Sequence, residues 1–292
     1  MSEPPVSVVT GANSGIGRAT ALHLAGAGHT VFGTVRSADR AGKLLDAAER
    51  DGVTVELVEL DIAAGASVRA GFAEIIGRAG RVDHLVNNAG VGGNGVVEET
   101  SSDRLLDVMN IDLCGAVRCL QEVLPSMRER GSGTIVNVTS IAGRLAAVAQ
   151  APYVAAKWAL EGISEELAFE VAPFGIRVAI IEPGVTKSSI FGKNVDAPNT
   201  SGAYDSQYER MMQMYAAGYV HASDASEVAE IIRHAIETDE PKLRYPVSWG
   251  GQAVVEGRAA MTDEEWVELG RIETLDEYVE AFSVAFGIDI ST

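Results

Sequence analysis

The chain has 292 residues, 47% of them hydrophobic, which is enough for one large α/β core. Its formal net charge of -18 argues against a nucleic-acid surface and disfavours anionic membranes and acidic carrier proteins. Only Arg128, Arg130 and Arg144 could form a local basic patch. No run is apolar for long enough to span a bilayer, and the first residues carry no secretory signal, so a cytoplasmic protein is expected.

Apolar strand-like runs alternate with helical runs along the chain, which is typical of parallel βαβ winding. Strands are predicted near 6–10, 30–35, 53–60, 82–87, 133–139, 176–181 and 243–247. Helices are predicted near 15–27, 38–50, 65–79, 102–129, 151–173 and 224–237. We therefore expect an α/β fold, a Rossmann-like doubly wound parallel sheet with helices on both faces, as a single domain over 1–247.

A glycine-rich turn follows the first strand and precedes the first helix. It consists of Gly11, Ala12, Asn13, Ser14, Gly15, Ile16 and Gly17. Glycines let the backbone turn tightly and approach a pyrophosphate, and the helix N-terminus adds free N–H groups and a positive dipole end. The spacing is G-x-x-x-G-x-G rather than the commoner G-x-G-x-x-G. The turn is predicted to bind a dinucleotide.

The second strand ends at Arg36 and Ser37. A carboxylate at this place would accept hydrogen bonds from the adenosine ribose and repel a 2′-phosphate, whereas a guanidinium offers planar donors suited to phosphate. This residue favours NADP(H) over NAD(H). The alternative is that Arg36 is a solvated surface arginine before a helix.

Tyr153 and Lys157 are four residues apart on a predicted helix, so their side chains share one face. A tyrosine ordinarily titrates near pH ~10, and a neighbouring positive charge brings it closer to neutral pH, where a general acid or base works best. Ser140, just upstream, can hold a substrate oxygen. The spacing alone is weak, but the glycine turn in the same chain strengthens it as an indication of acid–base chemistry.

The chain resembles the short-chain dehydrogenase/reductase family, in its single-domain branch. The resemblance extends from about Val6 to Thr186. The matching motifs are, in order, Thr10 to Gly17, Asp61, Asn87-Asn88-Ala89-Gly90, Asn110, Ser140, Tyr153, Lys157 and Pro183-Gly184. We find no departure from the family pattern at a catalytic position.

The resemblance implies an NAD(P)-dependent oxidoreductase with a catalytic set made of Asn110, Ser140, Tyr153 and Lys157. Tyr153 would be the acid in reduction and the base in oxidation, Lys157 would also bind the nicotinamide ribose, and the backbone of Asn110 would hold a water. Alternatively, Asn110 is merely a tolerated polar residue in a helix. Beyond the glycine turn, Arg36 and Ser37, the implied cofactor-binding residues are Asp61, Ile62, Asn88, Ala89, Gly90, Tyr153, Lys157, Pro183, Gly184, Val185 and Thr186. Asp61 could instead cap a turn.

The segment from about 185 to 220 corresponds to the family's variable substrate loop. It begins polar and glycine-rich and continues as a helix with Met211, Met212, Met214 and Tyr215. Flexible methionines suit irregular apolar surfaces, although at least one is expected in the core. Further walls are expected from Ile141, Leu145, Val148 and the segment 91–95, and no lysine or arginine is predicted to point into the pocket. An apolar ketone or secondary alcohol is therefore expected, and a steroid-like, retinoid-like or aromatic compound fits better than a charged acid.

Residues 248–292 are predicted to form an extension packed on the same domain, with one or two short acidic helices. Thr262 and Thr274 each begin a capping-box pattern. Trp266, Leu269, Tyr278 and Phe282 are expected to pack against the body, and a partner surface is the alternative.

No metal site is expected, because the histidines are scattered and Cys114 and Cys119 have no metal-ligand spacing. These two cysteines are interpreted as buried, reduced thiols. By analogy with the family, a homodimer or homotetramer is expected through the helices at 102–129 and 151–173. Two other functions stay open: a 3-oxoacyl reductase acting on a carrier-bound chain, and a sensor that binds NADP(H) without turnover.

Overall fold

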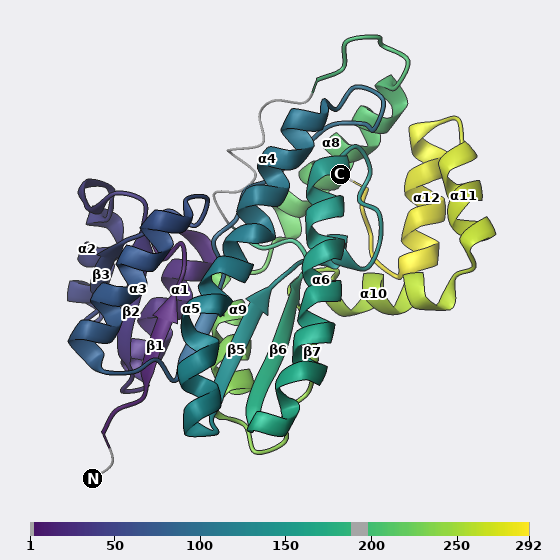
Figure 1. Ribbon diagram of the computed structural model, residues 1–292. Helices are drawn as coiled ribbons and strands as arrows, with labels where there is room; N and C mark the ends of the chain where they lie inside the picture. The colour runs from purple at the N-terminus through teal and green to yellow at the C-terminus, as the bar shows by residue number, and fades with distance from the viewer. Residues whose placement is uncertain (1–2, 188–197, 292) are drawn as a thin grey trace.

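The computed structural model describes residues 3–187 and 198–291. Its centre is a seven-stranded, fully parallel sheet in the order β3-β2-β1-β4-β5-β6-β7 (Figure 1). The strands are β1 (Val6–Val9), β2 (Thr30–Val35), β3 (Glu56–Glu59), β4 (His84–Asn87), β5 (Gly133–Val138), β6 (Ile176–Pro183) and β7 (Arg244–Val247). The strand order changes direction between β1 and β4, which is where open α/β sheets bind their ligands. The expected Rossmann-like sheet is confirmed.

Helices cover both faces of the sheet. One face carries α3 (Gly65–Ala79), α5 (Cys114–Arg130) and α6 (Ala151–Val171), with α4 (Ser102–Asp112) packed on α6. The other carries α1 (Gly15–Gly26), α2 (Gly42–Arg50) and α9 (Ala225–Glu237). Short 3₁₀ turns occur at η1 (Ala38–Arg40), η2 (Ile141–Gly143) and η3 (Ala172–Phe174).

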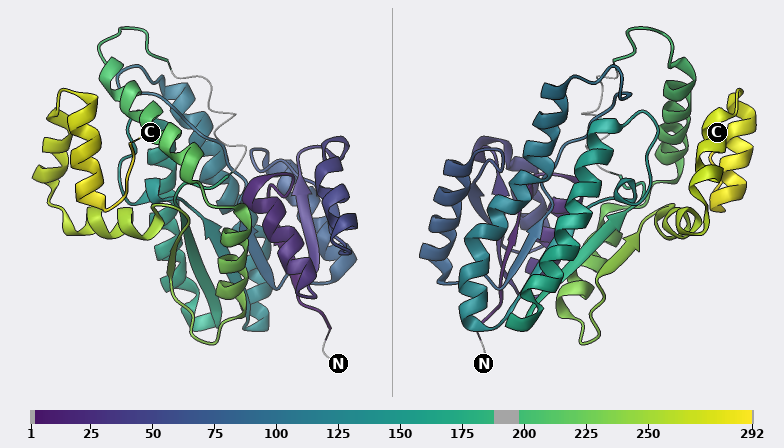
Figure 2. Two further views of the ribbon diagram at one scale, coloured as in Figure 1. Left: turned by 180° about the vertical axis from the view of Figure 1, so that it is seen from behind. Right: turned by 45° about the vertical axis from the view of Figure 1, so that its right-hand side comes forward.

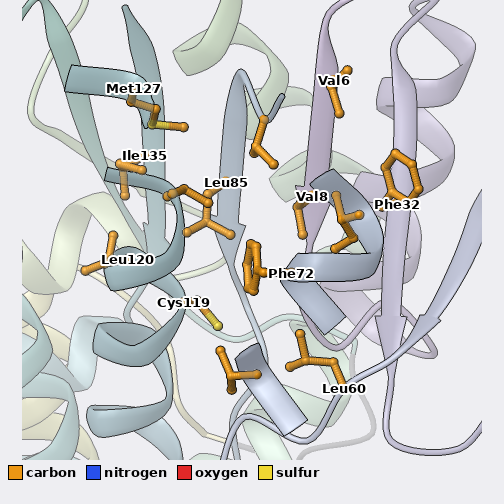
Figure 3. Close-up of a cluster of buried hydrophobic side chains, with 14 of the residues drawn as sticks. Val6, Val8, Phe32, Leu60, Phe72, Leu85, Cys119, Leu120, Met127 and Ile135 are labelled. Atoms are coloured by element: carbon orange, nitrogen blue, oxygen red, sulfur yellow. The ribbon is translucent and has the colours of Figure 1, made fainter. Parts of the chain in front are cut away.

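The sheet is held between two apolar layers because its central strands are apolar on both sides. Figure 3 shows the layer under α3 and α5, where Phe72 and Cys119 meet Val8 and Leu85 of the sheet. Burial raises the pKa of the Cys119 thiol to about 12, so this thiol is unreactive. Cys119 is buried as predicted. The prediction is wrong for Cys114, which is exposed at the start of α5.

The single helix predicted at 102–129 is in fact two helices. α4 ends at Asp112, and α5 begins at Cys114 after Leu113, whose φ of -105° and ψ of -64° depart from the helical values. Gly115 lies two residues after the break, but a single glycine within a helical pattern does not by itself indicate an interruption, and the periodicity runs on through it. The break matters because it falls directly after Asp112.

The C-terminal part forms a cover beside the carboxyl ends of the strands. It comprises α8 (Asp205–His221), α10 (Gly251–Ala260), α11 (Asp263–Arg271) and α12 (Leu275–Phe286). Figures 1 and 2 show α11 and α12 standing apart from the sheet, next to α8. Thr262 and Thr274 cap α11 and α12 as predicted, but three helices follow β7 rather than one or two. No helix in the described ranges is long and apolar enough to cross a membrane.

Candidate active site

The glycine turn connects β1 to α1 and lies against the end of β4. The Thr10 hydroxyl accepts hydrogen bonds from the backbone N–H groups of Asn88 and Ala89, both at 3.0 Å. A Cβ on Gly11, whose φ is +68°, would lie 2.9 Å from the Cα of Ala89, and one on Gly17 would lie 2.3 Å from Asn88 Nδ2. Both glycines are therefore required by close packing of the two strand ends.

A cavity of about 520 Å³ starts at this turn and runs along the carboxyl ends of the strands. It brings together nearly all of the residues predicted for the site. These are Gly11, Asn13, Ser14, Gly15, Ile16, Arg36, Ser37, Asp61, Ile62, Asn88, Ala89, Gly90, Ser140, Tyr153, Lys157, Pro183, Gly184, Val185 and Thr186. Gly17 and Asn110 do not line it. The shape and lining suit an elongated ligand placed across the switch in strand order.

One of the predicted cofactor residues, Asp61, also has a role in the fold. Asp61 Oδ1 accepts a hydrogen bond of 3.0 Å from the backbone N–H of Ala63, so Asp61 both caps a turn and lines the cavity. Arg36 is exposed at the end of β2, and Arg40, which the sequence analysis did not single out, lines the same end of the cavity. Two guanidinium groups therefore lie at this end of the cavity. A carboxylate in the same place would repel a 2′-phosphate, whereas guanidinium groups can bind it.

Ser140, Tyr153 and Lys157 line the middle of the cavity. Ser140 precedes η2, and its hydroxyl accepts a hydrogen bond from the backbone N–H of Ala142 at 3.1 Å. Tyr153 and Lys157 lie one turn apart on α6, with the lysine Nζ 5.5 Å from the centre of the tyrosine ring. Lys157 Nζ also donates to the carbonyl of Val138 at 3.3 Å. The lysine is thus fixed beneath the phenol.

The structure places Asp112, and not Asn110, beside the catalytic lysine. Lys157 Nζ is 3.3 Å from Asp112 Oδ2, and Asp112 Oδ1 accepts from the backbone N–H of Val91 at 2.8 Å. Asn110 instead faces Arg118, which donates to its Oδ1 at 2.6 Å and to its carbonyl oxygen at 3.1 Å. The side chain of Asn110 is therefore turned toward Arg118, and the backbone role expected for Asn110 stays a prediction.

Burial and charge act against each other in the Lys157–Asp112 pair. Both side chains are almost fully buried. Burial raises the pKa of the Asp112 carboxyl, opposed by the attraction of the Lys157 ammonium. For Lys157, burial would lower the pKa, but the Asp112 carboxylate, followed by Tyr153, outweighs it and raises the pKa. The lysine stays charged at neutral pH, close to a carboxyl whose pKa burial has raised.

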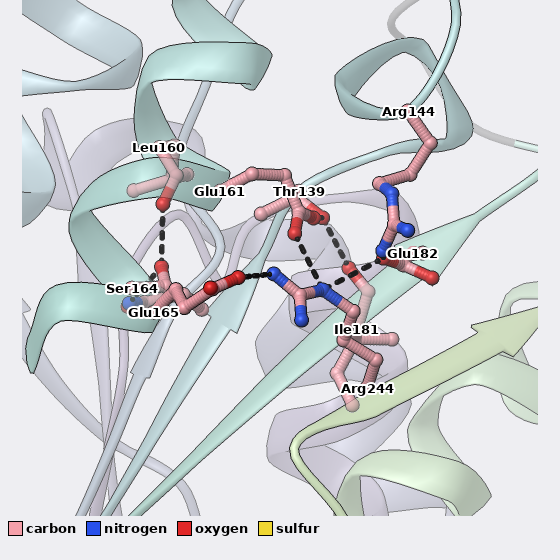
Figure 4. Close-up of polar contacts among 10 residues, drawn as sticks. Thr139, Arg144, Leu160, Glu161, Ser164, Glu165, Ile181, Glu182 and Arg244 are labelled. Carbon is pink, nitrogen blue, oxygen red and sulfur yellow. Dashed lines mark hydrogen bonds and ion pairs between the residues drawn. The ribbon is translucent and has the colours of Figure 1, made fainter. Parts of the chain in front are cut away.

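A buried polar network supports this site from behind (Figure 4). The Thr139 hydroxyl donates to Glu161 Oε1 at 2.6 Å, and Arg244 Nε lies 3.1 Å from Glu161 Oε2 and 3.5 Å from Glu182 Oε1. Arg144 reaches Glu182 from the other side at 2.9 Å. Burial, then the neighbouring Glu161, raises the pKa of Glu182 despite the two arginines. The network links β5, β6, β7 and α6 next to Ser140 and Pro183.

The far part of the cavity is apolar and aromatic. As predicted, Ile141, Leu145 and Val148 line it, together with Val91, Met211, Met214 and Tyr215. Met212 is instead 58% exposed. The cover adds Val254, Trp266, Tyr278 and Phe282, and also Arg210 from α8, while Trp249 and Ile288 line the cavity from just outside its helices. Of the predicted substrate segment 185–220, residues 188–197 lie outside the described residues.

Sequence reasoning missed Asp112, Arg40, Arg210 and Trp249 as site residues. The packing of Trp266, Leu269, Tyr278 and Phe282 against the body is confirmed, since they share one apolar cluster with Leu145 and Ala217. Within the described residues, no group of histidine, cysteine and acidic side chains is arranged to hold a metal ion.

Comparison with known proteins gives a consistent result. Residues 5–199 match the family model described as short chain dehydrogenase. The chain is 35% identical to the 17-beta-hydroxysteroid dehydrogenase type 1 of Mus musculus over 256 residues, covering 83% of this chain and 73% of that protein.

Two solved structures show the same likeness. A short-chain dehydrogenase from Streptomyces avermitilis superimposes with a TM-score of 0.79 at 37% identity, covering 93% of this chain and all of that one. A variant actinorhodin polyketide ketoreductase with NADPH does so with a TM-score of 0.68 at 32% identity, covering 80% of this chain and 90% of that one.

Proposed function

The chain belongs to the short-chain dehydrogenase family and is an oxidoreductase, and from that premise we propose an NADP(H)-dependent enzyme that interconverts a ketone or aldehyde and an alcohol on an apolar substrate. One observation carries the proposal. A single cavity joins the glycine turn, the Ser140–Tyr153–Lys157 group and an aromatic far wall.

Different residues along that cavity would bind the cofactor, transfer the proton and orient the substrate. The turn from Gly11 to Gly17 and the segments at Asn88 and Pro183 would hold the nicotinamide cofactor, which supplies or removes a hydride when bound. Tyr153 gives a proton to the carbonyl oxygen in reduction and takes it back in oxidation. Ser140 orients that oxygen, and the Lys157 ammonium favours the phenolate.

The preference for NADP(H) is supported by charge. Arg36 and Arg40 both line the adenosine end of the cavity, and Asp61 is the sole acidic residue among the described lining residues. A 2′-phosphate would meet planar guanidinium donors there. The similarity to a ketoreductase solved with NADPH points in the same direction.

The apolar substrate is supported by the lining of the far wall. Trp249, Trp266 and Phe282 offer large flat surfaces, and Met211 and Met214 offer adaptable ones. The similarity to a 17-beta-hydroxysteroid dehydrogenase agrees with a bulky, rigid substrate.

The direct test measures oxidation of NADPH and of NADH against a panel of apolar ketones and aldehydes. Turnover with NADPH is expected, and Tyr153→Phe should abolish it while NADPH affinity stays nearly intact. Full activity in Tyr153→Phe would disprove the mechanism.

The same test separates the two other functions. Tight NADPH binding without turnover of any free compound would favour a carrier-bound 3-oxoacyl substrate or a sensor. The similarity to a polyketide ketoreductase favours the former of these two. A carrier-bound substrate would need a basic docking patch on the enzyme. Arg144 is paired with the buried Glu182, so it does not add a free positive charge to Arg128 and Arg130, and this counts against the carrier-bound substrate.

Assembly into a homodimer or homotetramer is supported by apolar side chains that α4 and α6 leave exposed. Leu106 is 63% exposed and Phe169 is 83% exposed, on the helices expected to form the interface. Light scattering on the purified protein measures the mass directly, and a monomer would contradict this part of the proposal.

A further inference from the structure

Arg210 is a buried cation at the substrate end of the cavity. It lies on α8, is 3% exposed, and lines the cavity together with Tyr278 and Trp266. The other cations among the described lining residues are placed elsewhere: Arg36 and Arg40 are at the adenosine end, and Lys157 is under Tyr153. Arg210 therefore brings the one positive charge that the described part of the substrate wall contains.

The contacts of Arg210 hold it in place without neutralising it. Its Nη1 donates to the carbonyl of Gly270 at 3.3 Å, and its Nη2 donates to the carbonyl of Ile272. Its guanidinium carbon lies 4.4 Å from the centre of the Tyr278 ring. Within the described ranges, no carboxylate lies within 4 Å to form an ion pair with it.

A purely structural role explains only part of this arrangement. Arg210 does tie α8 to the C-terminal end of α11, where a cation is favoured by the helix dipole. Two neutral carbonyls, however, use only two of the five N–H donors of a guanidinium. A buried charge without a counter-ion is costly, and an acidic ligand that supplies the counter-ion would remove that cost.

The surroundings of Arg210 favour an acidic ligand. The chain has 41 aspartate and glutamate residues, yet among the described lining residues only Asp61, at the other end of the cavity, is acidic. Burial raises the pKa of Tyr278 to about 12, against the smaller effect of Arg210, so this phenol stays protonated at neutral pH. Its hydroxyl makes no hydrogen bond with the described residues, so the residue whose ring lies against the guanidinium also brings a neutral donor.

We propose that Arg210 binds a carboxylate of the substrate, so that the enzyme acts on an apolar carbonyl compound that carries an acid group away from its reacting carbon. This inference rests on the proposed function, because Tyr153 defines the reacting end. The guanidinium supplies two parallel donors to the carboxylate, and Tyr278 supplies a third. The aromatic and methionine side chains hold the apolar body between the two polar ends.

The test compares acids with their neutral esters. The probes are ω-(4-acetylphenyl)alkanoates of increasing chain length and the matching methyl esters, with NADPH. For the acid of best length, kcat/KM in the wild type should exceed that of its ester by about 10- to 100-fold, the range expected for hydrogen bonds to a charged group. Arg210→Gln should reduce this acid-to-ester ratio to near one, and Arg210→Lys should restore part of it.

The ratio separates binding of the acid from loss of structure, because a general disturbance of the cover lowers both rates together. Arg258→Gln is the matched control. Arg258 also belongs to the cover, donates to the carbonyl of Met261 at 3.0 Å and lies over the Trp266 ring, but it does not line the cavity. That variant should keep the wild-type ratio.

Where the probes are turned over, two results would overturn the inference: a wild-type ratio near one at every chain length, or an unchanged ratio in Arg210→Gln. Turnover of the esters that disappears in Tyr153→Phe would uphold the proposed function in either case. If neither acids nor esters are turned over, quenching of Trp249 and Trp266 fluorescence measures binding alone. Equal affinity of wild type and Arg210→Gln for every acid would then refute the carboxylate site.

Discussion

The ammonium of Lys157 lies 3.3 Å from the carboxylate oxygen Oδ2 of Asp112, and neither side chain is appreciably exposed. The opposite edge of the same carboxylate receives the backbone N–H of Val91, which directly follows the Asn88-Ala89-Gly90 segment. One side chain thus connects the catalytic lysine to the loop that lines the cofactor end of the cavity. The negative charge of Asp112 opposes the effect of Lys157, whose ammonium stabilises the phenolate of Tyr153.

Asp112→Asn should shift the pH dependence of catalysis. The amide oxygen can still accept from Val91 N–H, but the negative charge beside Lys157 is removed. An uncompensated ammonium favours the phenolate more strongly, so the acidic limb of the alcohol-oxidation profile should move toward lower pH. The measurement is kcat against pH for wild type and variant. Asp112→Ala also loses the contact with Val91 and is therefore the control for the positioning role of the side chain. An unchanged pH profile in Asp112→Asn would show that Asp112 carries no charge at the working pH.

Arg36→Asp should move cofactor preference toward NADH. The substitution replaces a phosphate-binding group with one that repels phosphate and accepts from ribose hydroxyls. The ratio of kcat/KM for NADPH over NADH should fall by about 10- to 100-fold. Arg40→Ala is the matched variant, since Arg40 lines the same end of the cavity and should cause a smaller fall. Unchanged NADPH selectivity in Arg36→Asp would remove Arg36 as the phosphate ligand.

Gly17→Ala and Gly26→Ala should have opposite effects, although both glycines belong to α1. A Cβ at Gly17 would lie 2.3 Å from Asn88 Nδ2 and 2.5 Å from the carbonyl of Gly11. The forced shift should cost about 1–3 kcal/mol of stability and weaken dinucleotide binding. At Gly26 nothing lies within 4 Å of the new Cβ, so alanine should stabilise the protein by at most ~1 kcal/mol. Denaturant titration and NADPH titration check both, and equal effects would contradict the packing argument.

His84 should make the protein sensitive to mild acid. Burial, then the charge of the nearby His29, lowers the pKa of His84 to about 4. In the unfolded chain the histidine has a pKa near ~6.5, so at mildly acidic pH the unfolded chain binds a proton that folded His84 does not. The stability from a neutral His84 is therefore present above pH ~6.5 and is lost as the pH falls toward ~4. Between pH ~8 and pH ~5.5 its contribution to the free energy of unfolding should fall by about 1.4 kcal/mol.

Denaturant unfolding at the two pH values, for wild type and His84→Gln, measures that loss. The variant should show a smaller loss, because glutamine does not titrate. His84 Nδ1 is buried without a hydrogen-bond partner among the described residues, so no acceptor is sacrificed by the change. Identical pH dependence in the two proteins would exclude His84 as the acid-sensitive group.

The parts of the fold that the sequence predicts well are those with a strong local pattern. The alternation of apolar runs gave the seven strands within a few residues, and the Thr262 box gave the start of α11. Glycine spacing placed the dinucleotide turn, since the backbone there has few alternatives to glycine. The break after Asp112 has no such pattern, and α4 and α5 read as one continuous helix.

The same limit explains why the contact between Asp112 and Lys157 was not predicted. Asn110 and Asp112 differ by two positions, which on a helix points their side chains in different directions. Only the three-dimensional position of Lys157 decides between them. Arg210 was missed for a related reason: its neighbours Gly270 and Ile272 are sixty residues away in sequence, and nothing local indicates that α11 would bury it.

The cover also determines when during synthesis the cavity is completed. The glycine turn, the catalytic residues and the first six strands all lie before residue 188. The aromatic wall, in contrast, comes from α8, α10, α11 and α12 and from the segments beside them up to Ile290, which is fully buried. The nascent chain can therefore assemble its dinucleotide half while the substrate half is still untranslated. Shortened products ending near Val247 would retain the seven strands but leave apolar surface around Leu145 and Ala217 uncovered, which makes them candidates for chaperone capture and degradation.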